Sequence, residues 1–161
     1  MTFGNDYFFS LLSGTKIAEP EQVVEQLMTN LNILAEFGAK HFLLNTIPDP
    51  ADESLVALLE PFKIHNQLFK KSVDDFVKKF NVNVNVFEAD KEFPTFTSKK
   101  FQEETGITKG FDEPCIPLEV PQINSSTPVC DNPELFLLFD KNHPTTKVHQ
   151  FIASLIFGFY S

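Results

Sequence analysis

Residues 20–50 read PEQVVEQLMTNLNILAEFGAKHFLLNTIPDP, and this stretch decides the fold. Pro20 suits the first turn of a helix, and the glutamates on either side of it suit the positive end of the helix dipole. Apolar residues then recur at helical spacing until Gly38, namely Val23, Val24, Leu27, Leu31 and Leu34. A short apolar run at residues 41–44 leads into a Pro-rich turn at residues 45–50. The stretch therefore predicts a helix followed by a buried parallel strand.

The alternation of helix and strand continues along the chain. Residues 52–80 form a second helical pattern with Pro61 inside it, so we expect two helices or a kink near Glu60. Valines alternate with asparagines over residues 82–86, which predicts a strand. Residues 91–133 have few periodic signals and predict a long connection, with one small helix near Lys99.

A last apolar run at residues 135–139 predicts a third strand. Residues 145–160 predict a closing helix that buries Val148, Ile152, Leu155, Ile156 and Phe159. Strands that alternate with helices in this way predict an α/β fold with a parallel sheet and covering helices.

The loops that follow the predicted strands are where ligands bind in such a fold. They are residues 45–49, 88–90 and 140–143. The last contains Asp140 and His143, followed directly by Pro144 and Thr145. In nucleophilic hydrolases a carboxylate orients the imidazole, which takes the proton of the nucleophile. Asp140 and His143 are therefore candidates for an acid/base pair, and a purely structural pair stays open as the alternative.

Length and charge limit the possible functions. A chain of 161 residues with 42% hydrophobic residues indicates one globular domain. The net charge of −9 argues against nucleic acid as a partner, because binding to phosphates needs clustered Lys and Arg. The sequence has neither a long apolar run nor a signal-like N-terminal segment, so it indicates no membrane span.

The two cysteines, Cys115 and Cys130, lie in a Pro-rich stretch without a nearby His, which disfavours a four-ligand zinc site. A disulfide is the simplest alternative and would indicate an exported protein, while two unpaired loop cysteines stay open. His41, His65 and His149 share no metal-ligand spacing with one another. The sequence therefore predicts no metal and no cofactor.

Four motifs follow one another along the chain: Gly4-Asn5-Asp6-Tyr7, Asn45-Thr46-Ile47-Pro48-Asp49-Pro50, His65-Asn66-Gln67-Leu68 and Asp140-x-x-His143-Pro144-Thr145. Together they resemble the conserved blocks of the SGNH (GDSL) esterases and lipases. Three further segments resemble the lecithinase and thermolabile-haemolysin branch, namely Cys115, Cys130-Asp131-Asn132-Pro133 and Thr146-Lys147-Val148-His149-Gln150. That branch includes secreted phospholipase A, lysophospholipase A and cholesterol acyltransferases. The resemblance covers essentially the whole chain and implies a flavodoxin-like, three-layer α/β/α fold with a parallel sheet.

The resemblance also implies a role for three residues. His143 is the general base, Asp140 orients it, and Asn5 places its side-chain amide in the oxyanion hole. A turn residue after Gly4 is the alternative for Asn5.

The family's Gly-Asp-Ser-Leu motif, which contains the nucleophilic serine, does not occur in the sequence, and neither does the block with the oxyanion glycine. Ser10, Ser13 and Ser54 lie in no comparable strand-to-turn context. We therefore expect residues 1–161 to be a single partial domain, the C-terminal part of an SGNH hydrolase without its N-terminal strands. We expect this chain alone to be inactive.

These inferences predict part of a secreted or cell-envelope lipolytic serine ester hydrolase that acts on phospholipid or lysophospholipid, with acyl transfer to sterol as a further reaction of the branch. The expected partners are the lipid substrate and the missing N-terminal segment of the same enzyme. The aromatic tail at residues 157–160 could make peripheral contact with a lipid surface or pack into the core. An inactive remnant that acts as a binding protein is one alternative. An unrelated flavodoxin-like binding domain is another.

Overall fold

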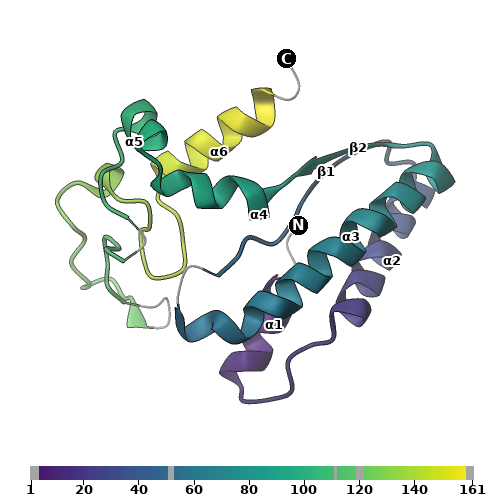
Figure 1. The fold of residues 1–161 in the computed structure, drawn as a ribbon, viewed down its shortest axis with the longest axis horizontal. Helices are drawn as coiled ribbons and strands as arrows, with labels where there is room; N and C mark the ends of the chain where they lie inside the picture. Colours follow the sequence, from purple (N-terminus) through teal and green to yellow (C-terminus); the bar gives the residue numbers. More distant parts are fainter. Residues whose placement is uncertain (1–3, 51–52, 111, 119–121, 159–161) are drawn as a thin grey trace. The chain divides into compact units, whose positions relative to one another are not determined.

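A computed structural model describes residues 4–50, 53–110, 112–118 and 122–158. The chain divides into two compact units, one up to Phe93 and one from Pro94 onward. Figure 1 labels their helices and strands. Two hydrophobic core clusters lie in the first unit, and a single partial domain over both units stays a prediction.

The first unit begins with helix α1 (Gly4–Leu12) and helix α2 (Pro20–Glu36). Pro20 occupies the start of α2 as predicted, and the chain leaves α2 through Gly38, whose φ of 100° favours glycine. The buried stripe of α2 confirms the four predicted positions Val23, Val24, Leu27 and Leu31. The prediction for Leu34 is wrong: it is 48% exposed, because Ala35 lies one turn after Leu31 on the buried face.

Strands β1 (His41–Asn45) and β2 (Asn83–Phe87) form a parallel pair, with His41 opposite Asn83 and Asn45 opposite Phe87. Both strands lie where the sequence predicted them. Together with the helices, this small parallel sheet confirms the α/β class. The described residues supply two strands of the larger sheet that the SGNH fold implies.

The second predicted helix is divided as expected from Pro61. A 3-10 helix, η1 (Glu53–Leu58), precedes helix α3 (Leu59–Phe80). Pro61 lies in the first turn of α3, where its missing N–H leaves no helical hydrogen bond unmade. The helix ends at Asn81, which has a left-handed φ of 49° and donates its N–H to the Val77 carbonyl oxygen at 2.9 Å.

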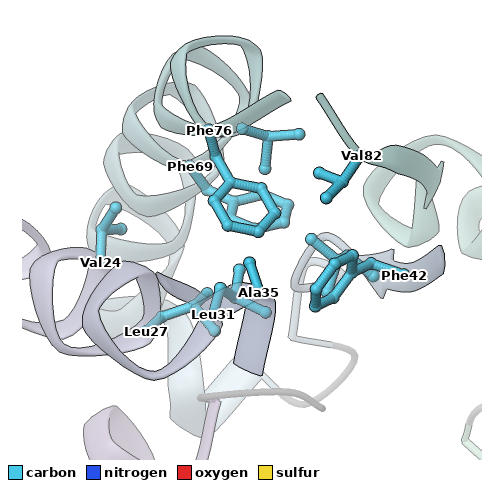
Figure 2. Close-up of a cluster of buried hydrophobic side chains, with 10 residues drawn as sticks. Val24, Leu27, Leu31, Ala35, Phe42, Phe69, Phe76 and Val82 are labelled. Atoms are coloured by element: carbon cyan, nitrogen blue, oxygen red, sulfur yellow. The ribbon is translucent and has the colours of Figure 1, made fainter. Parts of the chain in front are cut away.

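The main core of the first unit lies where α2 and α3 pack on β1 and β2. Figure 2 shows the side chains that meet there, among them Leu27 and Leu31 of α2 and Phe69 of α3. The ring of Phe42 on β1 meets the ring of Phe76 on α3 edge to face, with centroids 5.2 Å apart. A second buried cluster joins α1 to α2, α3 and the loop after β1 through Tyr7, Val23, Ile47, Leu58 and Phe62.

Short helices connect β2 to the second unit. Helix α4 (Ala89–Glu92) follows β2, and a 3-10 helix, η2 (Phe93–Thr97), comes next. Helix α5 (Lys99–Thr105) confirms the small helix that was predicted near Lys99. The Ser98 hydroxyl caps α5 by accepting the N–H of Phe101 at 3.2 Å.

Helix α6 (Thr146–Gly158) closes the second unit, after a short 3-10 helix, η4 (Pro133–Leu135). The rings of Phe96, Phe101 and Phe151 pack together, with centroids 5.0 to 5.6 Å apart. Among the residues predicted to be buried by this helix, only Val148 is fully so, since Ile152, Leu155 and Ile156 are half-buried. Phe159 lies outside the described residues.

The prediction of a third strand at residues 135–139 is wrong. The segment makes only isolated bridges, from Phe136 to Lys109 and from Leu138 to Pro144. Its backbone groups pair with three different segments, around residues 108–109, 115–116 and 143–145, so no continuous ladder forms with one partner. None of the described helices is long and apolar enough to cross a membrane.

Phe69→Ala is expected to lower the free energy of unfolding by about 3–5 kcal/mol, because Phe69 is 1% exposed and its loss leaves a cavity between α2 and α3. Phe37→Ala is the matched control, since Phe37 is 88% exposed and its replacement should change stability by less than about 0.5 kcal/mol. Urea unfolding followed by circular dichroism measures both variants. Equal losses would contradict the assignment of Phe69 to the core.

Candidate active site

Asp140 and His143 are in direct contact in the second unit. The Nδ1 atom of His143 lies 2.9 Å from Oδ1 and 3.0 Å from Oδ2 of Asp140. The Asp140 side chain is 4% exposed and that of His143 is 59% exposed. The carboxylate is therefore enclosed by protein, while the imidazole that it holds is accessible to a reactant.

The local backbone explains why Asp140 is held so firmly. Its Oδ1 also accepts the backbone N–H groups of Asn142 at 2.8 Å and His143 at 2.9 Å. An aspartate that accepts backbone N–H groups two and three residues later is a favourable turn-forming arrangement. The Phe139 N–H closes the same turn by donating to the His143 carbonyl oxygen at 2.7 Å.

Thr145 anchors the end of this turn before α6 begins. It is 2% exposed, its hydroxyl donates to the Phe136 carbonyl oxygen at 2.8 Å, and its N–H donates to the Leu137 carbonyl oxygen at 3.1 Å. The sequence between Asp140 and the helix is thus fixed at both ends.

This geometry suits a general base. A carboxylate at Nδ1 favours the tautomer in which Nδ1 carries the proton, so Nε2 is left free to accept one. When Nε2 takes a proton, the charge of Asp140 stabilises the imidazolium that forms. The chemistry available to the pair is therefore proton transfer to and from a nucleophile or a leaving group.

Asn5 is the second residue of α1, in the first unit, and its side chain is exposed. Within the described residues no hydrogen bond involves its amide, so the group is available as a donor. The structure thus brings Asp140 and His143 together in the second unit, and Asn5 belongs to the first unit. The role of Asn5 stays a prediction.

The three serines that the sequence did not favour as nucleophiles lie in or directly after helices. Ser10 lies in α1 and donates its hydroxyl to the Asp6 carbonyl oxygen at 2.6 Å. Ser13 follows α1 and donates to the Phe9 carbonyl oxygen at 2.7 Å. Ser54 lies in η1. None of the three lies at a turn from a strand into a helix, which is where this class of hydrolase places its nucleophile.

The loops after β1 and β2 carry a polar network in the first unit. The Thr46 hydroxyl donates to Asp90 Oδ1 at 2.5 Å, and the Asp90 N–H donates back to Thr46 Oγ1 at 3.1 Å. Lys70 Nζ lies 2.6 Å from Glu88 Oε1 and 3.4 Å from Asp90 Oδ2. Burial opposes the charge of Lys70, but these carboxylates outweigh it and raise the pKa of Lys70. Hydrogen bonds from Lys70 and Lys91 lower the pKa of Glu88.

A hollow of about 210 Å³ lies beside this network, lined by Asp49, Lys63, Asn66, Gln67, Lys70 and Asp90. Its volume is below the roughly 300–1,000 Å³ of sites that enclose a drug-sized ligand. The hollow by itself therefore cannot enclose a lipid molecule.

Two buried polar residues of α3, His65 and Asn66, were not assigned a role from the sequence. His65 is 2% exposed and lies with its Nδ1 atom 2.9 Å from the hydroxyl oxygen of Tyr7. Burial lowers the pKa of His65 to about 4, and burial with the charges of Asp6 and Glu21 raises the pKa of Tyr7. The spacing of Phe62, His65, Asn66 and Phe69 along one helical stripe was the signal that could have shown their burial.

Cys115 and Cys130 form a disulfide, with their Cα atoms 5.2 Å apart. The N–H groups of Cys115 and Ile116 donate to the carbonyl oxygens of Leu138 and Phe139, at 3.0 and 2.8 Å. The disulfide thus constrains residues 115–116, whose backbone is hydrogen-bonded to residues 138–139 just before Asp140.

Comparison with known families agrees with these motifs. The sequence model of the GDSL-like lipase/acylhydrolase family matches residues 1–156. The chain belongs to this family. No curated protein sequence matches the chain significantly.

Membership of the GDSL family confirms the SGNH resemblance in general and makes lipolytic ester hydrolysis the activity of the family to which the chain belongs. The lecithinase and thermolabile-haemolysin branch stays a prediction. Within the described part of this GDSL chain, no group of three or more His, Cys, Asp and Glu side chains could hold a metal ion.

His65 is expected to make stability depend on pH. In the unfolded chain it gains a proton below about pH 6.5, whereas in the folded chain it stays neutral until about pH 4. The contribution of neutral His65 to the free energy of unfolding is therefore complete above pH 6.5. This contribution of about 3 kcal/mol is lost as the pH falls toward 4. Urea unfolding measures the free energy of unfolding at neutral pH and at about pH 4. The decrease between the two pH values should be smaller by this amount in His65→Gln than in the parent chain.

His149→Gln is the matched control for this measurement, because His149 is exposed on α6 and its replacement should leave the pH dependence as in the parent chain. The same pH dependence in His65→Gln and the parent would show that His65 does not resist protonation.

Replacing both cysteines by serine is expected to lower the free energy of unfolding of the second unit by about 3 kcal/mol, because the unfolded chain loses a loop constraint over 15 residues. Hydrogen exchange of the amides of Cys115 and Ile116, which bond to residues 138–139, should accelerate with it. Unchanged exchange at these amides would mean that the disulfide does not support this segment.

Proposed function

We propose that this chain is the base-bearing, C-terminal part of a secreted lipolytic serine ester hydrolase that acts on phospholipid or lysophospholipid. The observation that carries the proposal is the contact between the enclosed Asp140 carboxylate and the accessible His143 ring, in a chain of the GDSL family. The sequence contains no Gly-Asp-Ser-Leu motif, so the nucleophilic serine is contributed from outside these residues.

The proposed reaction begins when His143 Nε2 accepts the proton of the serine hydroxyl. The serine oxygen attacks the acyl carbonyl carbon, and the negative charge that develops on the carbonyl oxygen receives a hydrogen bond from the Asn5 amide. The imidazolium, held by Asp140, then gives its proton to the departing alcohol oxygen of the lipid. A water molecule, activated in the same way, releases the fatty acid and regenerates the serine.

Secretion is supported by the disulfide, because cytosolic thiols are kept reduced. The phospholipid class is supported by the motifs at residues 115, 130–133 and 146–150, which resemble the lecithinase branch. In acyl transfer to a sterol, the sterol hydroxyl takes the place of water as the acceptor.

An inactive binding protein is the second candidate, and the missing serine motif is the observation that favours it. The two candidates differ in one respect that can be measured. A binding remnant gains no activity when a serine-bearing segment is supplied, whereas the catalytic part does.

Reconstitution tests the proposal directly. The chain alone should not hydrolyse p-nitrophenyl esters or release fatty acid from lysophospholipid. Co-expression with an N-terminal segment that carries the Gly-Asp-Ser-Leu block should create that activity. His143→Ala should then abolish it, and Asp140→Asn should lower kcat by as much as about 10⁴-fold, because the ring loses its correct tautomer.

His149→Ala is the matched control, since it removes an exposed imidazole from the same unit and should leave kcat unchanged. Hydrolysis by the chain alone, or reconstituted activity that survives His143→Ala, would contradict the proposal.

A further inference from the structure

The buried polar side chains of the first unit gather at one place. Among its described residues, those buried polar side chains are Thr46, His65 and Asn66. Thr46 follows β1 directly, and the other two are neighbours on α3. None of the buried side-chain nitrogens and oxygens in the described residues lacks a hydrogen-bond partner. This is a satisfied polar cluster at the carboxyl end of β1.

Asn66 holds the backbone of the loop after β1. Its Oδ1 accepts the N–H of Ile47 at 2.9 Å, and its Nδ2 donates to the carbonyl oxygen of the same residue at 2.8 Å. Two hydrogen bonds between one amide side chain and one residue fix both the position and the orientation of that residue. Ile47 is 4% exposed, so water cannot replace Asn66 as its partner.

His65 holds α1 in a corresponding way. The Tyr7 hydroxyl oxygen lies 2.9 Å from His65 Nδ1, and both side chains are almost wholly buried. The Tyr7 ring also packs edge to face on Phe62 of α3, with centroids 5.5 Å apart. Because burial keeps His65 neutral, its Nδ1 can accept a hydrogen bond from the Tyr7 hydroxyl while Nε2 carries the ring proton.

The two contacts meet at the start of α1. Ile47 and Tyr7 belong to the same buried cluster, and a Cβ added at Gly4 would lie 3.7 Å from Cγ2 of Ile47. Asn5 lies between Gly4 and Tyr7. Successive helical residues are about 100° apart, so a buried Tyr7 turns Asn5 toward the opposite, exposed side of α1. The contacts that fix the positions of Tyr7 and Ile47 therefore also fix the position of the Asn5 amide on the exposed side of α1.

We propose that His65 and Asn66 are positioning residues for Asn5, and that they act through Tyr7 and Ile47. An apolar pair at these two positions could fill the same space. It could not fix the position of the first turn of α1 relative to the loop after β1, because dispersion contacts have no direction. Preorganised donors are what an oxyanion site requires. The inference rests on the proposed function in one respect, the role of Asn5 as that donor.

Nuclear magnetic resonance of the full chain labelled with ¹⁵N tests the positioning without any need for activity. Tyr7→Phe removes one hydroxyl and keeps the ring, and Asn66→Ala removes the two bonds to Ile47. Both variants should shift and broaden the backbone and side-chain amide signals of Asn5. Asn66→Ala should also accelerate hydrogen exchange at the Ile47 amide by more than about tenfold.

Two control variants lie beside the tested residues. Ser10→Ala removes a hydroxyl whose bond stays within α1, and Gln67→Ala removes an exposed amide next to Asn66 on α3. Both should leave the Asn5 signals unchanged. Asn5 signals that stay unchanged in Tyr7→Phe and Asn66→Ala as well would overturn the proposal. If Asn66→Ala does not fold, Tyr7→Phe decides, because it keeps the ring packing.

Kinetics of the reconstituted enzyme separate positioning from general stability. Tyr7→Phe should lower kcat by about three- to tenfold with KM unchanged, and should lower it no further when Asn5 is already alanine. An equal further loss in the Asn5→Ala background would overturn the proposal, since Tyr7 would then act by another route. Asn5→Ala that leaves kcat unchanged would instead contradict the proposed function, so the two failures are distinguishable.

Discussion

The buried stripe of α3 is the constraint on which the first unit depends. One face of this helix carries Phe62, Asn66, Phe69, Val73 and Phe76 at intervals of three and four residues, with His65 directly before Asn66. Phe69 and Phe76 meet α2 and β1 in the main core, whereas Phe62 packs in the second cluster with Tyr7. His65 and Asn66 bind α1 and the loop after β1. A shift of α3 by one residue would turn this face away from its partners, so the register of α3 sets the register of the unit.

The second unit depends on a different kind of interaction, the enclosure of the Asp140 carboxylate. Three N–H groups converge on it, two from the backbone and one from the His143 ring. Around this turn the backbone of residues 135–139 is tied to several segments rather than to one strand. The turn places a carboxylate that is held by backbone N–H groups beside an accessible imidazole.

The sequence could predict those features that depend on neighbours along the chain. The helices α2, α3 and α5 and the strands β1 and β2 follow from apolar periodicity, proline position and turn residues, and the structure confirms them. The Asp140 to His143 contact was predictable for the same reason, since three residues separate its members. The strand predicted at residues 135–139 failed because a short apolar run says nothing of which segments will bond to its backbone.

The sequence alone thus determined the α/β class, the family motifs and the closeness of Asp140 to His143, because periodicity and local turns are properties of adjacent residues. Only the tertiary structure decided that His65 and Asn66 are buried, and which backbone and hydroxyl groups they bind. Their partners Tyr7 and Ile47 lie 58 and 19 residues away. A hydrogen bond over such a separation exists only once packing has excluded water from both groups, and no local pattern encodes that exclusion.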